Sequence, residues 1–104
     1  MSFSKYEMKI IQWGMDRGIV QNGKPIGQAI KTLEEVTELL DAINRGDMPE
    51  IKDAVGDIVV TLLMVCATLD IDLTECLAGA YEQIKHRRGY LTAAGVFVKE
   101  VATC

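Results

Sequence analysis

Histidine and cysteine are scarce in this chain. It contains one histidine and three cysteines among 104 residues, and Cys66, Cys76 and Cys104 lack the spacing of a metal site. His86 does not belong to a pair of Glu-x-x-His motifs, which a di-iron carboxylate bundle requires. We therefore expect neither a disulfide nor a di-iron centre, and we interpret the cysteines as reduced core residues.

Long hydrophobic runs and an excess of positive charge are also absent. The longest apolar stretch, residues 58–69, is interrupted by threonines and is too short to span a bilayer. The N-terminus lacks the continuous hydrophobic segment of a signal peptide. A net charge of −4 disfavours a general nucleic-acid binder. We expect a cytoplasmic protein that binds neither a membrane nor a nucleic-acid polymer.

The composition that is present is typical of a folded domain. Hydrophobic residues make up 49% and charged residues 25%, with only two prolines. The length has room for one core, which predicts a single domain over residues 1–104. This apolar content is generous for so small a monomer. We therefore expect a homo-oligomer, either a dimer or a tetramer.

Three capping patterns predict where helices begin, because each places a side-chain oxygen three residues before a glutamate. The pairs are Ser4 with Glu7, Asp47 with Glu50, and Asp72 with Glu75. Together with glycine and proline signals, they predict four helices, over residues 4–17, 25–44, 48–69 and 73–88. The sequence therefore predicts an all-α, four-helix bundle-like fold, with a short extended C-terminal tail from Gly89 onward.

Acidic residues gather on the second and third predicted helices. On the second, Glu34 and Glu38 border the apolar side and Glu35 lies further round. On the third, Asp53 and Asp57 lie on a narrow polar stripe of an otherwise apolar surface. The members of the apolar side, which we expect to face the core, are Ile26, Ile30, Leu33, Val36 and Leu40.

A short turn at residues 44–47 should fold these two helices into an antiparallel hairpin, which brings the acidic groups to the same height. Asp57 has no suitably placed cation on its own helix, and an unpaired buried carboxylate is unfavourable. A hard divalent cation, magnesium or manganese, would resolve the repulsion. The alternative is a solvated helix face on which Lys31 pairs with Glu35.

Basic and aromatic residues offer two further candidates. Lys85, Arg87 and Arg88 close the fourth predicted helix, where they either complement the helix dipole or bind phosphates. Trp13 is either a core residue or a platform on which a base stacks.

The segments Glu34-Glu35-Val-Thr-Glu38 and Val55-Gly56-Asp57 resemble the MazG-like nucleotide pyrophosphohydrolases of the all-α superfamily, and in particular their short, single-domain, phage-type members. By position, the resemblance implies that Glu35, Glu38 and Asp57 are metal ligands. Ala54 stands where the family has a glutamate, and Asp53 is the candidate for the fourth ligand. The resemblance also implies that dimerisation helps to build the site.

The resemblance implies a magnesium-dependent enzyme that converts a nucleoside triphosphate to the monophosphate and pyrophosphate. Glu34, Glu35 and Glu38 are its candidate catalytic carboxylates, with Glu34 or Glu35 as the general base. The candidate substrate-binding residues are Lys31, Lys85, Arg88 and Trp13. Two alternatives stay open, namely a non-catalytic helical nucleotide-binding or interaction module, and a pyrophosphohydrolase that acts on phosphoribosyl-ATP.

Overall fold

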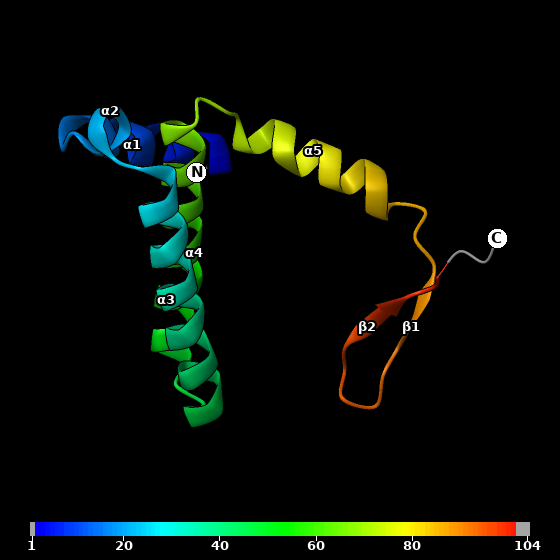
Figure 1. Cartoon of the computed structure of the whole chain (residues 1–104). Helices are drawn as coiled ribbons and strands as arrows, with labels where there is room; N and C mark the ends of the chain where they lie inside the picture. Colours follow the sequence, from blue (N-terminus) through cyan, green and yellow to red (C-terminus); the bar gives the residue numbers. More distant parts are fainter. Residues whose placement is uncertain (1, 102–104) are drawn as a thin grey trace. The chain divides into compact units, whose positions relative to one another are not determined.

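A computed structural model describes residues 2–101 and contains five helices and a two-stranded sheet. The chain divides into two compact units, Met1–Leu73 and Thr74–Cys104. The all-α fold class is therefore confirmed, and the small sheet coincides with the predicted extended tail. In chain order the elements are α1 (Phe3–Asp16), α2 (Ile19–Asn22), α3 (Pro25–Arg45), α4 (Met48–Thr68), α5 (Leu73–Ile84), β1 (Gly89–Leu91) and β2 (Phe97–Lys99) (Figure 1).

The helix starts follow local capping, with one correction. Ser2, not Ser4, caps α1, because its side chain accepts a hydrogen bond of 3.3 Å from the Lys5 backbone N–H. Asp47 caps α4 as expected, accepting from the Glu50 N–H at 3.3 Å. The short helix α2 was not predicted. It follows Gly18, which adopts a left-handed φ of 75° and lets the chain turn immediately after α1.

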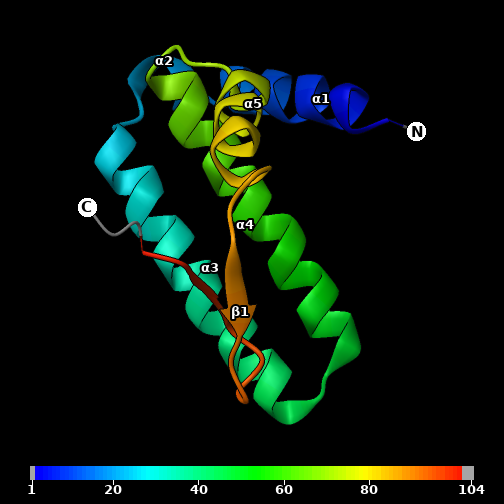
Figure 2. The same cartoon turned by 90° about the vertical axis from the view of Figure 1, so that its right-hand side faces the viewer.

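An antiparallel hairpin of α3 and α4 forms the centre of the first unit, as predicted (Figures 1 and 2). Gly46 ends α3 in a left-handed conformation, with φ at 65°, and only one further residue precedes α4. So short a connection forces the two helices to lie side by side. Helices α1 and α2 pack near the other end of α4.

The face of α3 that meets α4 differs from the predicted one. Ile26, Ile30, Leu33 and Leu40 are between 52% and 68% exposed, so the most apolar stripe of α3 is not the core face of this unit. Apolar periodicity alone does not determine which face of a helix its neighbour covers. The stripe that α3 turns towards α4 is more buried and comprises Thr32, Glu35, Val36, Leu39 and Ala42.

Helix α4 supplies most of the core, as its apolar composition predicts. Leu63 and Met64 are almost completely buried, and Ala54 is 4% exposed. Helix α1 comes close to α4 at Gly14, where an added Cβ would lie only 2.5 Å from the Met64 Sδ. Cys66 is buried as expected, whereas Cys76 is exposed, which corrects its assignment to the core. Cys104 lies outside the described residues.

The second unit consists of the rest of α5 and a β-hairpin. Helix α5 ends at Ile84, four residues before the predicted end, so the cations at 85–88 follow the helix rather than close it. The hairpin explains the early stop, because the Glu100 N–H donates to the Arg88 carbonyl at 2.7 Å and extends the strand pairing. Gly89 pairs with Lys99 and Leu91 with Phe97 in an antiparallel register.

Within the described part of the chain, no single helix is both long and apolar enough to cross a membrane; α4 and α5 pass that test only as a pair, across the break between them. A single domain over residues 1–104 stays a prediction.

Candidate functional site

A pocket of about 400 Å³ opens in the first unit, beside the hairpin. Charged, polar and apolar side chains all contribute to its wall, and one of them is an indole ring. Four of the predicted site residues, from three different helices, line it together. The complete lining is Trp13, Ile19, Gln28, Lys31, Glu35, Asp57, Val60, Thr61 and Met64.

Glu35 is the most unusual side chain in this pocket. Its Oε2 atom is buried and has no hydrogen-bond partner. Burial raises the pKa of the Glu35 carboxyl, and a hydrogen bond with the Glu38 side chain and the charges of Glu38 and Asp57 raise it further. Lys31 acts in the opposite direction on this pKa. The Glu35 carboxyl therefore lies beside two other acidic side chains, those of Glu38 and Asp57.

Asp57 on α4 is half-buried on the opposite wall. Burial raises the pKa of its carboxyl, and the negative charges of Asp53 and Glu38 add to the increase. The two helices therefore bring Glu35, Glu38, Asp53 and Asp57 within electrostatic range, as counting from the turn predicted. The neighbouring negative charges destabilise the ionised forms of Glu35 and Asp57.

The chemistry of these side chains suits a hard divalent cation. Their donors are all carboxylate oxygens, and the Glu35 Oε2 has no hydrogen-bond partner within the protein. Among residues 2–101, however, no three histidine, cysteine, aspartate or glutamate side chains are already arranged around a common point. The carboxylates therefore repel each other in pairs rather than forming a finished coordination shell.

Asp53 and Ala54 have opposite environments. Ala54 is buried between the helices at 4% exposure, so the position where the family has a glutamate is part of the packing here. Asp53 is exposed, yet it is close enough to raise the pKa of Asp57. Of the two, only Asp53 brings an additional oxygen donor to the neighbourhood of Asp57.

Lys31 and Glu34 lie one turn apart on α3. The Lys31 Nζ is 4.0 Å from the Glu34 carboxylate, and both side chains are more than half exposed. Lys31 also lines the pocket, whereas Glu34 does not. The predicted pairing of Lys31 with Glu35 is thus replaced by an ion pair with Glu34, although Lys31 still acts on the Glu35 charge.

Trp13 on α1 lines the pocket and is 41% exposed. The Arg17 guanidinium lies over the indole ring, 4.7 Å from its centroid. So large an exposed fraction shows that Trp13 is not a fully buried core residue. Its ring is accessible at the pocket wall.

Lys85 and Arg88 belong to the second unit. Lys85 forms an ion pair with Glu82 one turn earlier. Arg88 lines a separate hollow of about 460 Å³ on this unit, together with Arg87 and Lys99.

Sequence reasoning missed part of the pocket wall. Ile19 belongs to α2, whose existence was not predicted. Val60 and Thr61 could have been found, because they lie one turn after Asp57 on the same helix and so share its face. Met64, a further turn along, could have been found in the same way.

Three comparisons with known proteins identify what this chain is similar to. Residues 28–92 match the model of the MazG nucleotide pyrophosphohydrolase domain, a segment that includes all four carboxylates. An uncharacterized 18.2 kDa protein from the rep-hol intergenic region of Haemophilus phage HP1 is 35% identical over 63 residues. That alignment covers 61% of this chain but 39% of the phage protein, so the chain spans less than half of that relative.

A solved structure shares the fold. The MazG-like pyrophosphohydrolase of cyanophage S-2L, bound to dGDP and three catalytic Mn²⁺ ions per active site, superimposes with a TM-score of 0.73. The superposition covers 99% of this chain and 97% of the cyanophage protein at 19% identity. The family model spans more than half of the chain, and this chain belongs to the MazG nucleotide pyrophosphohydrolase domain family.

Proposed function

We propose that the chain is a cytoplasmic, metal-dependent nucleotide pyrophosphohydrolase that converts a nucleoside triphosphate to the monophosphate and pyrophosphate. The observation that carries this proposal is the unpartnered, buried Oε2 of Glu35, in a pocket that also contains Asp57, Lys31 and Trp13. Membership of the MazG family supports this class of reaction. The dGDP and Mn²⁺ bound by the cyanophage protein support a nucleotide substrate and a divalent cation.

Glu35, Glu38 and Asp57 would hold the cation, with Asp53 as the fourth donor. Magnesium is the proposed physiological ion, and manganese should replace it because both accept oxygen ligands. Binding would draw the carboxylates together and relieve their mutual repulsion. A cation bound here would polarise phosphate oxygens and increase the acidity of a water molecule.

The reaction requires one water molecule and one base. The water oxygen attacks the α-phosphorus, the bond from this phosphorus to the α,β-bridging oxygen breaks, and pyrophosphate leaves. We assign the water proton to Glu35 rather than Glu34, because Glu35 lines the pocket and Glu34 does not. Glu34 is instead paired with Lys31 on the exposed side of α3.

The chemistry of the pocket lining suggests how a nucleotide would bind in it. Trp13 would stack on the base, and Lys31 would bind phosphate. Lys85 and Arg88 are proposed as further phosphate ligands. Guanine nucleotides are the first substrates to test, because the cyanophage protein binds dGDP.

We also propose that a second copy of the chain covers the exposed apolar stripe of α3, which comprises Ile26, Ile30, Leu33 and Leu40. These residues recur at three- and four-residue spacings, the pattern of a helix-packing seam. Their exposure on the first unit supports an interaction surface. Analytical ultracentrifugation should detect a homo-oligomer, and Leu33→Glu should reduce its mass to that of one chain. A monomeric wild type would contradict this part of the proposal.

A nucleotide panel tests the proposed reaction. The purified protein is mixed with common and modified nucleoside triphosphates and phosphoribosyl-ATP, each with Mg²⁺ or Mn²⁺, and the products are separated by ion-exchange chromatography. We expect equal amounts of monophosphate and pyrophosphate, a large loss in Glu38→Gln, and no loss in Asp41→Asn. Release of orthophosphate would contradict the reaction. Tight binding without turnover would favour a non-catalytic module, and turnover of phosphoribosyl-ATP alone would change the substrate.

A further inference from the structure

Two threonine hydroxyls meet between the helices that hold the carboxylates. The Thr32 Oγ1 on α3 lies 2.8 Å from the Thr61 Oγ1 on α4. Thr61 is 8% exposed and is surrounded on its helix by the buried residues Leu63, Met64 and Cys66. A hydroxyl in such surroundings needs a hydrogen-bond partner. Thr32 provides that partner from the opposite helix.

The contact is part of a chain of hydrogen bonds that ends on the backbone of both helices. The Thr32 Oγ1 is 3.1 Å from the Gln28 carbonyl oxygen, and the Thr61 Oγ1 is 2.7 Å from the Ile58 carbonyl oxygen. Each hydroxyl has one hydrogen, so either Thr32 donates to Thr61 and Thr61 to Ile58, or Thr61 donates to Thr32 and Thr32 to Gln28. In both arrangements the hydrogen bond between the two helices is kept.

The threonine pair is adjacent to the proposed ligands on both helices. Thr32 precedes Glu35 by three residues, and Thr61 follows Asp57 by four, so each lies one turn from a carboxylate on the same face. Thr61, Glu35 and Asp57 also line the same pocket. A change in the spacing or rotation of the helices at the threonines would therefore move Glu35 relative to Asp57.

The carboxylates themselves oppose the close spacing of α3 and α4. Glu35, Glu38 and Asp57 lie close enough for their negative charges to repel, and this repulsion tends to separate α3 from α4 beside the pocket. A hydrogen bond across the same part of the hairpin opposes that separation before a cation arrives. It therefore fixes the height of α3 relative to α4 at the level of these carboxylates.

We propose that Thr32 and Thr61 are positioning residues, whose mutual hydrogen bond fixes α3 against α4 beside Glu35 and Asp57, so that a divalent cation can draw these two carboxylates together. This inference rests on the proposed function, because it assumes that these carboxylates bind the cation. Partners outside the coordination shell that orient metal ligands contribute about 10- to 100-fold to affinity in other sites. We expect the lower end here, because the pair orients helices rather than touching a ligand directly.

Direct Mn²⁺ titration, followed by electron paramagnetic resonance of the free ion, tests the proposal without relying on turnover. Thr61→Val and Thr32→Val remove one hydroxyl each at nearly constant shape, and both should weaken Mn²⁺ binding about tenfold. Thr61→Ser keeps the hydroxyl and should bind like the wild type. The matched controls are Thr37→Val and Thr68→Val, whose hydroxyls bond only to carbonyl groups on their own helices, Leu33 at 3.1 Å and Val65 at 2.9 Å.

The double variant Thr32→Val/Thr61→Val separates positioning from stability. Replacing both partners by apolar groups of the same shape leaves stability nearly unchanged, so its thermal midpoint should be close to that of the wild type. Its Mn²⁺ affinity should nevertheless stay about tenfold lower.

Two results would overturn the inference. One is wild-type Mn²⁺ affinity in the double variant, which would make the pair ordinary packing. The other is an equal loss in Thr68→Val, which would make the effect unspecific. If the wild type itself binds no Mn²⁺, the proposed function fails, and that outcome is distinct from wild-type binding that the variants leave unchanged.

Discussion

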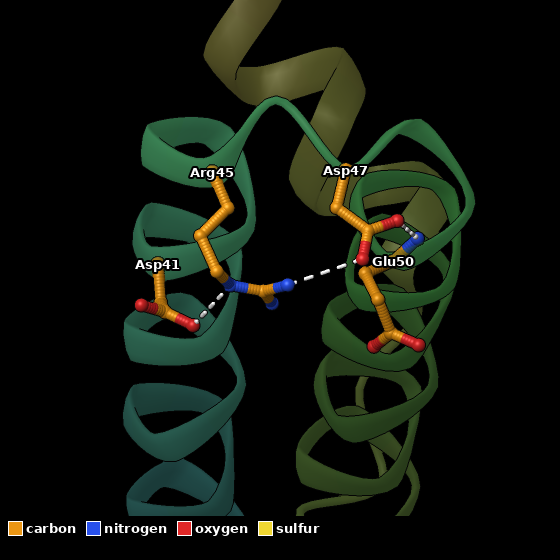
Figure 3. Close-up of polar contacts among 4 residues, drawn as sticks. All are labelled: Asp41, Arg45, Asp47 and Glu50. Carbon is orange, nitrogen blue, oxygen red and sulfur yellow. Dashed lines mark hydrogen bonds and ion pairs between the residues drawn. The ribbon is translucent and has the colours of Figure 1, made fainter.

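The acidic residues of the α3–α4 hairpin have different partners at the turn and beside the pocket. At the turn, Arg45 lies between two acids, with its Nε 2.9 Å from the Asp41 carboxylate and an Nη 3.1 Å from the Asp47 carboxylate (Figure 3). Asp47 additionally caps α4 by accepting from the Glu50 N–H. The hydrogen bond to Asp41 and its charge raise the pKa of Arg45, so the opposite charges stabilise each other.

Beside the pocket the acids have no such compensation. Glu35 has an unpartnered oxygen, and the pKa values of Glu35 and Asp57 are raised rather than lowered, first by burial and then by other carboxylates. Lys31 is the cation that acts on Glu35, and it is also paired with Glu34. At the turn the hairpin therefore pairs its acids with an arginine. Beside the pocket the Glu35 Oε2 has no such partner, and this is the group for which we propose a ligand. The proposed cation would supply at the pocket what Arg45 supplies at the turn.

The largest effect is expected from removing an acid beside the pocket. Glu35→Gln removes a proposed ligand and base, and should reduce kcat/KM for nucleotide hydrolysis by more than about 100-fold, because even indirect partners of metal ligands contribute 10- to 100-fold. Steady-state kinetics would measure this loss. The metal-free variant should unfold at a higher temperature than the wild type, because a repelling charge has been removed. A normal rate in Glu35→Gln would place the chemistry elsewhere.

Adding the cation should produce the next largest effect. Mn²⁺ at 100 times its dissociation constant should raise the free energy of unfolding by about 2.7 kcal/mol, provided that the ion binds only the folded state. Urea denaturation with Mn²⁺ and with EDTA would measure the difference. Asp57→Asn should lose this stabilisation, whereas Asp41→Asn at the turn should keep it. If Mn²⁺ stabilised Asp57→Asn and Asp41→Asn equally, the acids beside the pocket and those at the turn would not differ in cation binding.

The pH dependence should have opposite signs with and without the cation. The pKa values of Glu35 and Asp57 are raised above their ordinary values of 4.5 and 3.8, so the folded metal-free protein binds more protons than the unfolded chain. The stability that these groups contribute is present below those ordinary values and is lost as the pH rises through the raised pKa values. Thermal unfolding in EDTA should show this decline.

With saturating Mn²⁺ the trend should reverse, because the cation competes with protons and binds the deprotonated carboxylates. Unfolding at the same series of pH values would show stabilisation by Mn²⁺ that grows as the pH rises. If the stability curves with and without Mn²⁺ depended on pH in the same way, the carboxyl groups with raised pKa values would not be the groups that bind the ion.

The smallest effect is expected at the turn. Arg45→Met removes an exposed ion-pair network and should cost less than about 1 kcal/mol of stability, because exposed ion pairs contribute little. Asp47 keeps its cap, so the start of α4 should be unchanged. Chemical denaturation would measure the loss, and Mn²⁺ affinity should equal that of the wild type. A clear loss of Mn²⁺ binding would show that the turn and the pocket are coupled.

Local signals predicted the hairpin and the height of its acids. Gly46 and Asp47 fix the end of one helix and the start of the next, so counting residues from the turn brings Glu38 level with Asp53 and Asp57. The rise per residue of a helix is constant, which makes this inference independent of side-chain packing. The structure agrees with this count, because the charges of Asp53 and Glu38 both raise the pKa of Asp57.

The sequence pattern did not predict which face of α3 packs against α4, nor where α5 ends. The apolar pattern of α3 favours the stripe of Ile30 and Leu33 as the core face, but the more buried stripe, which includes Thr32 and Ala42, faces α4. Periodicity locates apolar faces without telling which neighbour covers each of them. Similarly, local helix signals predicted that α5 continues to Arg88. In the structure it ends at Ile84, because the backbone of Arg88 is hydrogen-bonded to Glu100 in the hairpin.

The most direct test of the account compares one acid from each region in a single experiment. Mn²⁺ is titrated into the wild type, Asp57→Asn and Asp41→Asn, and free Mn²⁺ is followed by electron paramagnetic resonance. The account predicts that the wild type and Asp41→Asn bind with the same affinity, and that Asp57→Asn binds at least about 100-fold more weakly, because it loses a direct ligand. Equal binding by Asp57→Asn and Asp41→Asn would contradict the claim that the unsatisfied carboxylates beside the pocket form the metal site.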